Sequence, residues 1–359
     1  MVPVPRSGAS PAVVDLVGRC HAGLDAPSLL SEFTSRVGAV VPVDAVFCAT
    51  VDPDTMLFTG SASREIPEDL AGRFLANELL EPDVNKFTAL ASSADPVDWL
   101  DRATAGDRLA SPRYREIMAP AGLGDELRAA VRSGGACWGV VCLHREDRPS
   151  GFTPIEAAVV RRLARHLGDG LRRALLVAQA AEADEEDSGA PGVLLVGDDG
   201  SLVATTPAGE RWLWELSGPA DGGGLPGPVA AVIARLQAIR STPAPARPPR
   251  VRVRTRSGRW AVIHAAEVRG LTDNGVAVVV EAARPPEVAP LVLLAHGLTE
   301  REAQVAALAL RDRPTKLIAR ELQISINTVE HHFKRIFDKV GVASRGELRA
   351  RVFSEQRAP

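Results

Sequence analysis

The segment about 326–340 carries polar and cationic side chains at a spacing that a helix would gather on one face. Its apolar residues follow the helical period and form one stripe: Val329, Phe333, Ile336, Phe337 and Val340. The opposite face then carries amide, hydroxyl, imidazole and cationic groups from Asn327, Thr328, His331, Lys334 and Arg335. An α-helix fits the major groove of DNA, where such groups bind base edges and phosphates. We therefore predict that this segment is a DNA-recognition helix.

A helix is predicted directly upstream, beginning after Thr299. Thr299 and Glu302 match a capping box, in which each side chain accepts a hydrogen bond from the backbone of the other residue. This helix is expected to end near Leu310. Over residues 298–359, twelve Lys and Arg residues stand against eight Asp and Glu residues, although the whole chain has a net charge of −3. The basic balance thus coincides with the predicted DNA-binding segment.

A short second helix, Thr315–Leu322, is predicted between these two. Pro314 is expected at its first position, where a backbone N–H would have no partner within the helix, so proline is tolerated there. The helix is expected to pack through three apolar side chains, Leu317, Ile318 and Leu322. After a turn at 323–325, Ser325 is expected to cap the recognition helix through its hydroxyl group.

This C-terminal segment resembles the LuxR-type DNA-binding domain over its whole four-helix module. The matching residues are Leu298-Thr299-x-Arg301-Glu302, Ile318-Ala319, Ser325-x-x-Thr328-Val329-x-x-His332, Ile336, Lys339-Val340-Gly341-Val342 and Ser344-Arg345-Gly346-Glu347-Leu348. The resemblance implies that four residues face bases or the DNA backbone: Thr328, Glu330, His331 and Lys334. It also implies that three residues lie near phosphates: Lys316, Ser325 and Lys339.

The sequence departs from the family pattern at three positions. Asp312 and Pro314 stand where the family usually has glycine and serine. Glu330 stands where the family often has a lysine that contacts DNA. A carboxylate repels phosphate but accepts a hydrogen bond from a cytosine amino group, so we expect a different operator.

The first part of the chain, about residues 13–177, is predicted to be an α+β domain with an antiparallel sheet. Predicted strands are Ala45–Val51 and Met56–Thr59 around a turn, then Leu127–Val131 and Trp138–Leu143 joined by Ser133-Gly134-Gly135. A long helix follows from about Thr153. Its leucine stripe either covers the sheet or pairs with a second copy of the chain: Leu163, Leu167, Leu171 and Leu175.

This order of elements resembles a GAF domain. The resemblance rests on the opening helical segment Val13–Val40, the glycine hairpin followed by Trp138-Gly139, and Gly151-Phe152-Thr153-Pro154 before the closing helix. GAF domains sense small ligands or mediate dimers. The resemblance therefore implies a small-molecule ligand in the N-terminal part or a homodimer.

A second block, residues 192–283, resembles a PAS domain. Two predicted strands, helices and three further strands follow in order, the strands being Val193–Val196, Ser201–Ala204, Val251–Thr255, Trp260–Val268 and Val276–Glu281. The block has no cysteine for a flavin photosensor, and its only histidine, His264, is more typical of a core or surface residue than of a haem ligand. We predict no cofactor here.

Three stretches rich in proline or acidic residues divide the chain. Glu182–Pro191 and Ala283–Pro290 are predicted to be domain linkers, and Thr242–Arg250 a loop inside one domain. The predicted architecture is thus an α+β multidomain chain, with a GAF-like domain (13–177), a PAS-like α/β domain (192–283) and an all-α helix-turn-helix module (291–355). A length of 359 residues accommodates these domains.

Composition excludes several other classes of protein. No apolar run approaches the roughly 18 residues of a membrane span, and the N-terminus lacks a signal-peptide pattern, so a cytoplasmic protein without a membrane partner is expected. The cysteines are too scattered for a disulfide framework or a four-thiolate zinc site and are expected to be buried thiols: Cys20, Cys48, Cys137 and Cys142. No metal site, cofactor or catalytic site is predicted.

These observations together favour a sequence-specific transcription regulator that binds double-stranded DNA, controlled by its N-terminal domains and acting as a homodimer. Three alternatives stay open. An enzyme with a helical tail is disfavoured, because the phosphate-loop, zinc-helix and nucleophile-elbow motifs are missing from the sequence. A phosphorelay output protein would need an early acidic pair that the opening helices do not supply. The third is a protein-interaction scaffold.

Overall fold

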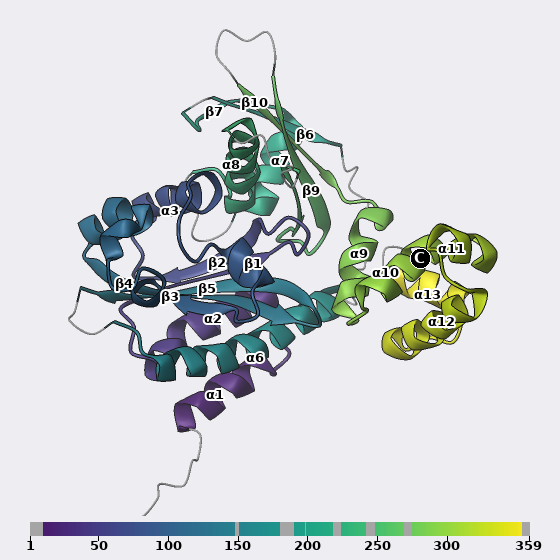
Figure 1. The fold of residues 1–359 in the computed structure, drawn as a ribbon. Coiled ribbons are helices and arrows are strands. Elements are labelled where there is room, and N and C mark those ends of the chain that lie inside the picture. The colour runs from purple at the N-terminus through teal and green to yellow at the C-terminus, as the bar shows by residue number, and fades with distance from the viewer. Residues whose placement is uncertain are drawn as a thin grey trace, which may run out of the picture. The chain divides into compact units, whose positions relative to one another are not determined.

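The computed structural model describes residues 10–147, 151–179, 190–197, 199–217, 224–241, 248–268 and 275–353 (Figure 1). The chain divides into two compact units. Unit 1 consists of the described residues within 1–51, 60–132 and 137–171, and unit 2 of those within 52–59, 133–136 and 172–359. In the described part of the chain, every helix is too short or too polar to cross a bilayer.

A five-stranded sheet with the order β2-β1-β5-β4-β3 lies at the centre of the N-terminal part of the chain. Its strands are β1 (Ala45–Val51), β2 (Phe58–Arg64), β3 (Val97–Trp99), β4 (Leu123–Ser133) and β5 (Ala136–Glu146). Both β1 with β5 and β3 with β4 pair antiparallel, in agreement with the predicted antiparallel sheet, although strand β3 itself was not predicted. Strands β4 and β5 are longer than predicted and are joined at Gly134 and Gly135, whose φ angles of 60° and 84° suit a tight turn that other residues rarely adopt.

Helices cover both faces of this sheet. They are α1 (Pro11–Cys20), α2 (Ala26–Arg36), α3 (Glu68–Leu80), α4 (Phe87–Ser92), α5 (Leu100–Ala103) and α6 (Pro154–Gln179), with short helical turns at Val37–Ala39, Arg108–Ala110, Tyr114–Met118 and Ala119–Ala121. In Figure 1, α1, α2 and α6 lie on one side of the sheet and α3 on the other. Strands β4 and β5 are therefore buried along almost their whole length, without the alternation of a half-exposed strand.

Three of the four leucines in the predicted α6 stripe are buried inside the chain, and the fourth, Leu175, is partly buried. Leu163 and Leu167 have 0% exposure and Leu171 has 4%. A side chain on Gly139 of β5 would meet the carbonyl oxygen of Ala49 at 2.6 Å and the side chain of Leu171 at 2.9 Å, so glycine permits the helix to approach the sheet closely. Of the two roles predicted for the stripe, the structure supports covering the sheet.

A second five-stranded sheet, with the order β7-β6-β10-β9-β8, lies in unit 2. Its strands are β6 (Gly192–Val196), β7 (Leu202–Thr205), β8 (Arg250–Arg254), β9 (Trp260–Glu267) and β10 (Val276–Ala282), and its helices are α7 (Pro207–Leu216) and α8 (Gly227–Ser241). Burial alternates along β6 and β10, as expected for a sheet covered on one face. The strands match the predicted order, while the PAS-like identity stays a prediction.

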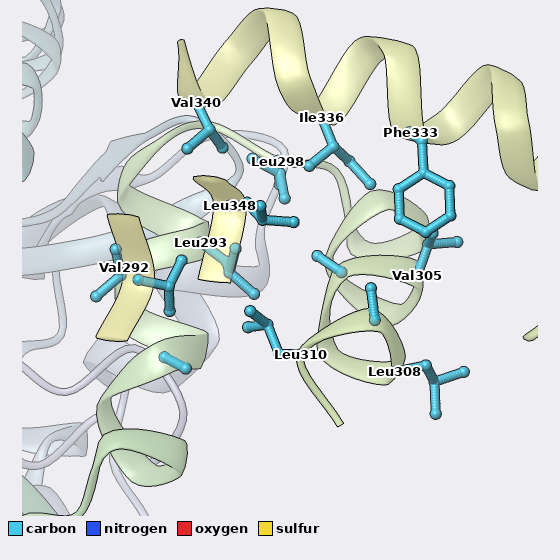
Figure 2. Close-up of a cluster of buried hydrophobic side chains, with 14 of the residues drawn as sticks. Val292, Leu293, Leu298, Val305, Leu308, Leu310, Phe333, Ile336, Val340 and Leu348 are labelled. Atoms are coloured by element: carbon cyan, nitrogen blue, oxygen red, sulfur yellow. The ribbon is translucent and has the colours of Figure 1, made fainter. Parts of the chain in front are cut away.

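Helices alone form the C-terminal part of unit 2: α9 (Pro285–Ala295), α10 (Glu300–Leu310), α11 (Thr315–Glu321), α12 (Ile326–Val340) and α13 (Arg345–Phe353). They share one apolar core, in which Leu293, Leu298, Val305, Ile336 and Leu348 are almost fully buried (Figure 2).

The prediction of an unpacked linker at Ala283–Pro290 was wrong. Helix α9 begins at Pro285, and Val288 and Ala289 are buried in the C-terminal core. Two of its prolines stand in the first turn, where a helix tolerates residues without an N–H, and burial of the apolar side chains favours the helix despite Pro290. The other predicted linker, Glu182–Pro191, and the loop Thr242–Arg250 lie largely outside the described residues.

The cysteines are as predicted. Cys20, Cys48, Cys137 and Cys142 are all buried and form no disulfide. Burial raises the pKa of the Cys48 thiol to about 12, because the apolar surroundings disfavour the thiolate.

Candidate nucleic-acid interface

Helix α12 has the two faces that its sequence predicts. Val329, Phe333, Ile336 and Val340 are buried against α10 and α11, and Phe337 is partly buried. Figure 2 shows Phe333, Ile336 and Val340 pointing from this helix into the core. The apolar stripe thus packs against the core of the module, which fixes the direction of the polar face.

Both ends of α12 are set by local chemistry. The Ser325 hydroxyl accepts a hydrogen bond from the Thr328 N–H at 3.0 Å, which confirms the predicted cap. At the other end Gly341 adopts a left-handed conformation with φ of 73°, and its N–H donates to the Phe337 carbonyl. These caps place the helix at residues 326–340, as predicted.

Helix α11 differs from its prediction in two details. Pro314 precedes the helix as its N-cap residue and does not occupy the first helical position. Leu317 is 43% exposed, whereas Ile318 and Ala319 are buried and Leu322 is partly buried. The inner face follows the i, i+3, i+4 spacing of residues 315, 318, 319 and 322, and Leu317 lies off that face.

All nine predicted DNA-binding residues are on the surface, but they differ in what their side chains contact: Lys316, Ser325, Asn327, Thr328, Glu330, His331, Lys334, Arg335 and Lys339. Within the described chain, no hydrogen bond or ion pair engages the side chains of five of them: Lys316, Asn327, Glu330, His331 and Lys334. Ser325 and Thr328 share a hydrogen bond between their hydroxyl groups at 2.8 Å. The other two are held by a carboxylate of the same module.

That carboxylate is Glu302 in the first turn of α10. It forms the predicted capping box, since its Oε2 accepts from the Thr299 N–H at 2.8 Å and its own N–H donates to the Thr299 hydroxyl at 3.3 Å. It is also fully buried, which sequence patterns did not indicate. Lys339 donates to Oε2 at 2.6 Å, and the Arg335 Nε lies 3.3 Å from Oε1. Glu302 therefore joins the start of α10 to the last two turns of α12.

The electrostatics of Glu302 agree with this role. Burial by itself would raise the pKa of its carboxyl group. The hydrogen bonds from Lys339 and from Thr299 outweigh that effect and hold the pKa below its usual value. The carboxylate is thus charged at neutral pH, and Lys339 neutralises it while also donating to the Gly297 carbonyl at 3.0 Å.

Arg345 is a further positioning residue that sequence reasoning did not single out. Its guanidinium donates to the Thr315 hydroxyl at 2.6 Å and lies over the Phe333 ring, 4.0 Å from the centroid. It therefore ties the start of α13 to α11 and α12 at once. Its place in the Ser344-Arg345-Gly346 motif was visible in the sequence, but the partners were not.

Two family models match this chain. Residues 296–351 match the model described as bacterial regulatory proteins, luxR family, and residues 25–171 match the model of the GAF domain. The chain is 44% identical over 50 residues to the spore germination protein GerE of Bacillus subtilis (strain 168), an alignment that covers 14% of this chain and 68% of that protein.

Several solved structures are similar to part of this chain. The GAF domain of an Acinetobacter phosphoenolpyruvate-protein phosphotransferase is 14% identical, covering 48% of this chain and 96% of that one with a TM-score of 0.33. The VqsR LBD domain of Pseudomonas aeruginosa is 17% identical, covering 46% of this chain and 98% of that one with a TM-score of 0.33. On the two model matches and the identity with GerE, this chain carries a GAF domain in its N-terminal part and belongs to the luxR family of bacterial regulatory proteins.

Proposed function

We propose that this protein is a sequence-specific transcription regulator that inserts the polar face of α12 into the major groove of its operator. The observation that carries the proposal is that the apolar face of α12 packs against the core of the module, whereas its polar face is exposed. Five exposed side chains that engage no partner in the described part of the chain then become the principal contacts: Lys316, Asn327, Glu330, His331 and Lys334. Amide, imidazole, carboxylate and ammonium groups together can bind base edges and phosphates.

The remaining predicted contacts take different parts in this proposal. Ser325 and Thr328 stand at the N-terminus of α12, where hydroxyl groups and free N–H groups can bind a phosphate. Arg335 and Lys339 are engaged by Glu302 and serve mainly to orient the helix. We therefore expect Lys339 to influence DNA binding through the position of α12.

The direct test removes His331 and Lys334 together in the full-length chain. The operator is first selected from a random DNA library, and binding is then measured by fluorescence anisotropy. The double variant is expected to lose about 1–3 kcal/mol per base contact, or about 5- to 150-fold in affinity for each. Arg349→Ala is a matched control, because Arg349 is an exposed cation of α13 paired with Asp312. Unchanged affinity of a folded double variant would refute the proposal.

Variants of Glu330 and Lys316 distinguish the recognition of bases from the binding of phosphates. Glu330→Gln is expected to relax selection at one base pair, because a neutral amide both donates and accepts hydrogen bonds. Lys316→Gln is expected to weaken binding to all DNA sequences alike. It is also expected to lower the slope of log affinity against log salt concentration by about one. Selection from the random library and a salt titration distinguish these two results.

Control by the N-terminal part completes the proposal. A GAF domain that binds a small molecule, or a homodimer that pairs two α12 helices on two half-sites, would change how the module is presented to DNA. Leu163, Leu167 and Leu171 of α6 are buried inside the chain and Leu175 is partly buried, so we expect a dimer to use another surface. Sedimentation of the chain with its operator tests the dimer, and a monomer on the complete operator would exclude it.

A further inference from the structure

We propose that Glu126, Cys142 and His144 form a buried binding site for one divalent transition-metal ion in the GAF domain. The proposal is independent of DNA binding by the C-terminal module. It rests on three potential ligands that the fold brings together in unit 1.

The sheet places the three side chains. Cys142 and His144 are two residues apart on β5, so their side chains project from the same face of the strand. Glu126 lies on β4, the strand next to β5. One ligand atom from each residue lies within 4.8 Å of the other two. All three residues are buried, with exposures of 1% for Glu126, 4% for Cys142 and 2% for His144.

The three side chains already contact one another. The Cys142 thiol donates to Glu126 Oε1 at 2.9 Å and lies 3.3 Å from His144 Nε2. The imidazole therefore contacts a thiol that is already committed to the carboxylate. Its other nitrogen, Nδ1, is buried and has no hydrogen-bond partner among the residues that the structure describes. The nitrogen that faces Cys142, Nε2, is therefore the one placed to bind an ion together with the sulfur.

Arg113 leaves one carboxylate oxygen available. Its guanidinium binds Glu126 Oε2 at 2.6 Å and also donates to the side chain of Asn77 at 3.2 Å. Oε1 faces Cys142 and lies 3.8 Å from the Arg128 Nε, beyond hydrogen-bonding distance, so this oxygen can bind a metal ion. An arginine that holds the second oxygen of a ligating carboxylate fixes the direction of the first, as outer-sphere partners of metal ligands do.

The charge balance also favours a divalent ion. Metal binding breaks the S–H bond of Cys142, forms a bond from sulfur to the metal and releases one proton to solvent. The ion with its thiolate, carboxylate and neutral imidazole then carries no net charge. The two arginines beside Glu126 keep their closest partners, because Arg113 stays on Oε2 and Arg128 donates to Glu78 at 2.9 Å.

The donor set selects the class of metal. A thiolate, an imidazole and one carboxylate oxygen suit Zn²⁺, Co²⁺ or Fe²⁺, whereas Mg²⁺ and Ca²⁺ require oxygen ligands. Metal–ligand bonds of about 2.0–2.3 Å in a tetrahedral site separate the ligand atoms by about 3.5 Å. The sulfur therefore has to move away from Oε1 by several tenths of an ångström, which a rotation of the Cys142 and Glu126 side chains provides.

Co²⁺ titration of the full-length, chelator-treated chain tests the site. Coordination by Cys142 is expected to give a thiolate-to-cobalt charge-transfer band that saturates at one Co²⁺ per chain, to release protons, and to vanish when Zn²⁺ is added. Cys142→Ala is expected to lose the band, and His144→Gln to weaken Co²⁺ binding at least tenfold. Cys48→Ala, which removes another fully buried thiol, is the matched control and is expected to keep the band.

Circular dichroism establishes that each variant is folded before titration. Absence of the band in the unmodified chain would overturn the proposal without any variant. A band that persists in folded Cys142→Ala or that disappears in Cys48→Ala would also overturn it, since either result places the cobalt at another cysteine.

Discussion

Replacing Glu302 with glutamine is expected to loosen the contact between α10 and α12 without unfolding the helices. The side chain keeps its shape, and its amide oxygen can still accept from the Thr299 N–H. What it loses is the charge that faces Lys339 at 2.6 Å and Arg335 at 3.3 Å. Glu302→Gln therefore isolates the charge from the capping box.

The expected magnitude follows from these bonds. A hydrogen bond to a charged group contributes about 1.5–3 kcal/mol to stability and a neutral one about 0.5–1.5 kcal/mol. Lys339 and Arg335 keep 30% and 53% of their side chains exposed, so water solvates them in the variant and no buried charge is left unpaired. We expect a loss of about 1–2 kcal/mol, which is a factor of about 5–30 in the population of the opened state.

Hydrogen exchange of the full-length chain, followed by mass spectrometry, measures this opening locally. Peptides from 299–310 and 326–340 are expected to exchange about 5–30 times faster in Glu302→Gln, while peptides from the two sheets keep their rates. Glu300→Gln is the matched control, because Glu300 lies in the same first turn but is exposed. Equal exchange in the two variants would show that the ion pairs of Glu302 do not hold α12, and the reasoning would be refuted.

Three other results are expected from the same module. Lowering the pH is expected to speed hydrogen exchange in residues 299–310. Because the pKa of Glu302 is depressed in the folded state, its carboxylate contributes fully to stability above the usual glutamate pKa, and this contribution is lost as the pH falls through the lower folded value. Glu302→Gln is expected to remove this acid response. Ile336→Ala, at 0% exposure, is expected to cost about 2–5 kcal/mol, measured by local exchange, and a loss below 1 kcal/mol would contradict the packing of α12. Gly341→Ala is expected to lower the stability of the end of α12 by about 1–2 kcal/mol, because alanine is strained at a φ of 73°, and local hydrogen exchange measures this loss. Gly346→Ala in α13 is the control and is expected to leave stability unchanged, because Gly346 has no positive φ.

Local signals in the sequence predicted much of this structure. The start of α10 followed from Thr299 and Glu302, the start of α12 from Ser325, and the buried face of α12 from the spacing of Val329, Phe333 and Ile336. Each of these depends on residues within one or two turns of each other. The glycine turn between β4 and β5 was predicted for the same reason.

Predictions failed where packing overrides local preference. The proline-rich stretch before Leu291 forms helix α9, because burial of its apolar side chains in the C-terminal core outweighs the weak helix preference of proline. Leu317 is exposed because the neighbouring helices contact a different face of α11. Neither outcome was visible without the positions of the neighbouring elements.

The sequence by itself determined that α12 is amphipathic, where it begins and ends, and which of its side chains point away from the core. The tertiary structure decided which polar groups are engaged: Glu302 holds Lys339 from 37 positions away, and Glu126 meets Cys142 across two strands. The reason is physical. Helical periodicity and caps act within one or two turns, whereas a pair of distant groups meets only when packed elements bring them within bonding distance, and no local pattern encodes that distance.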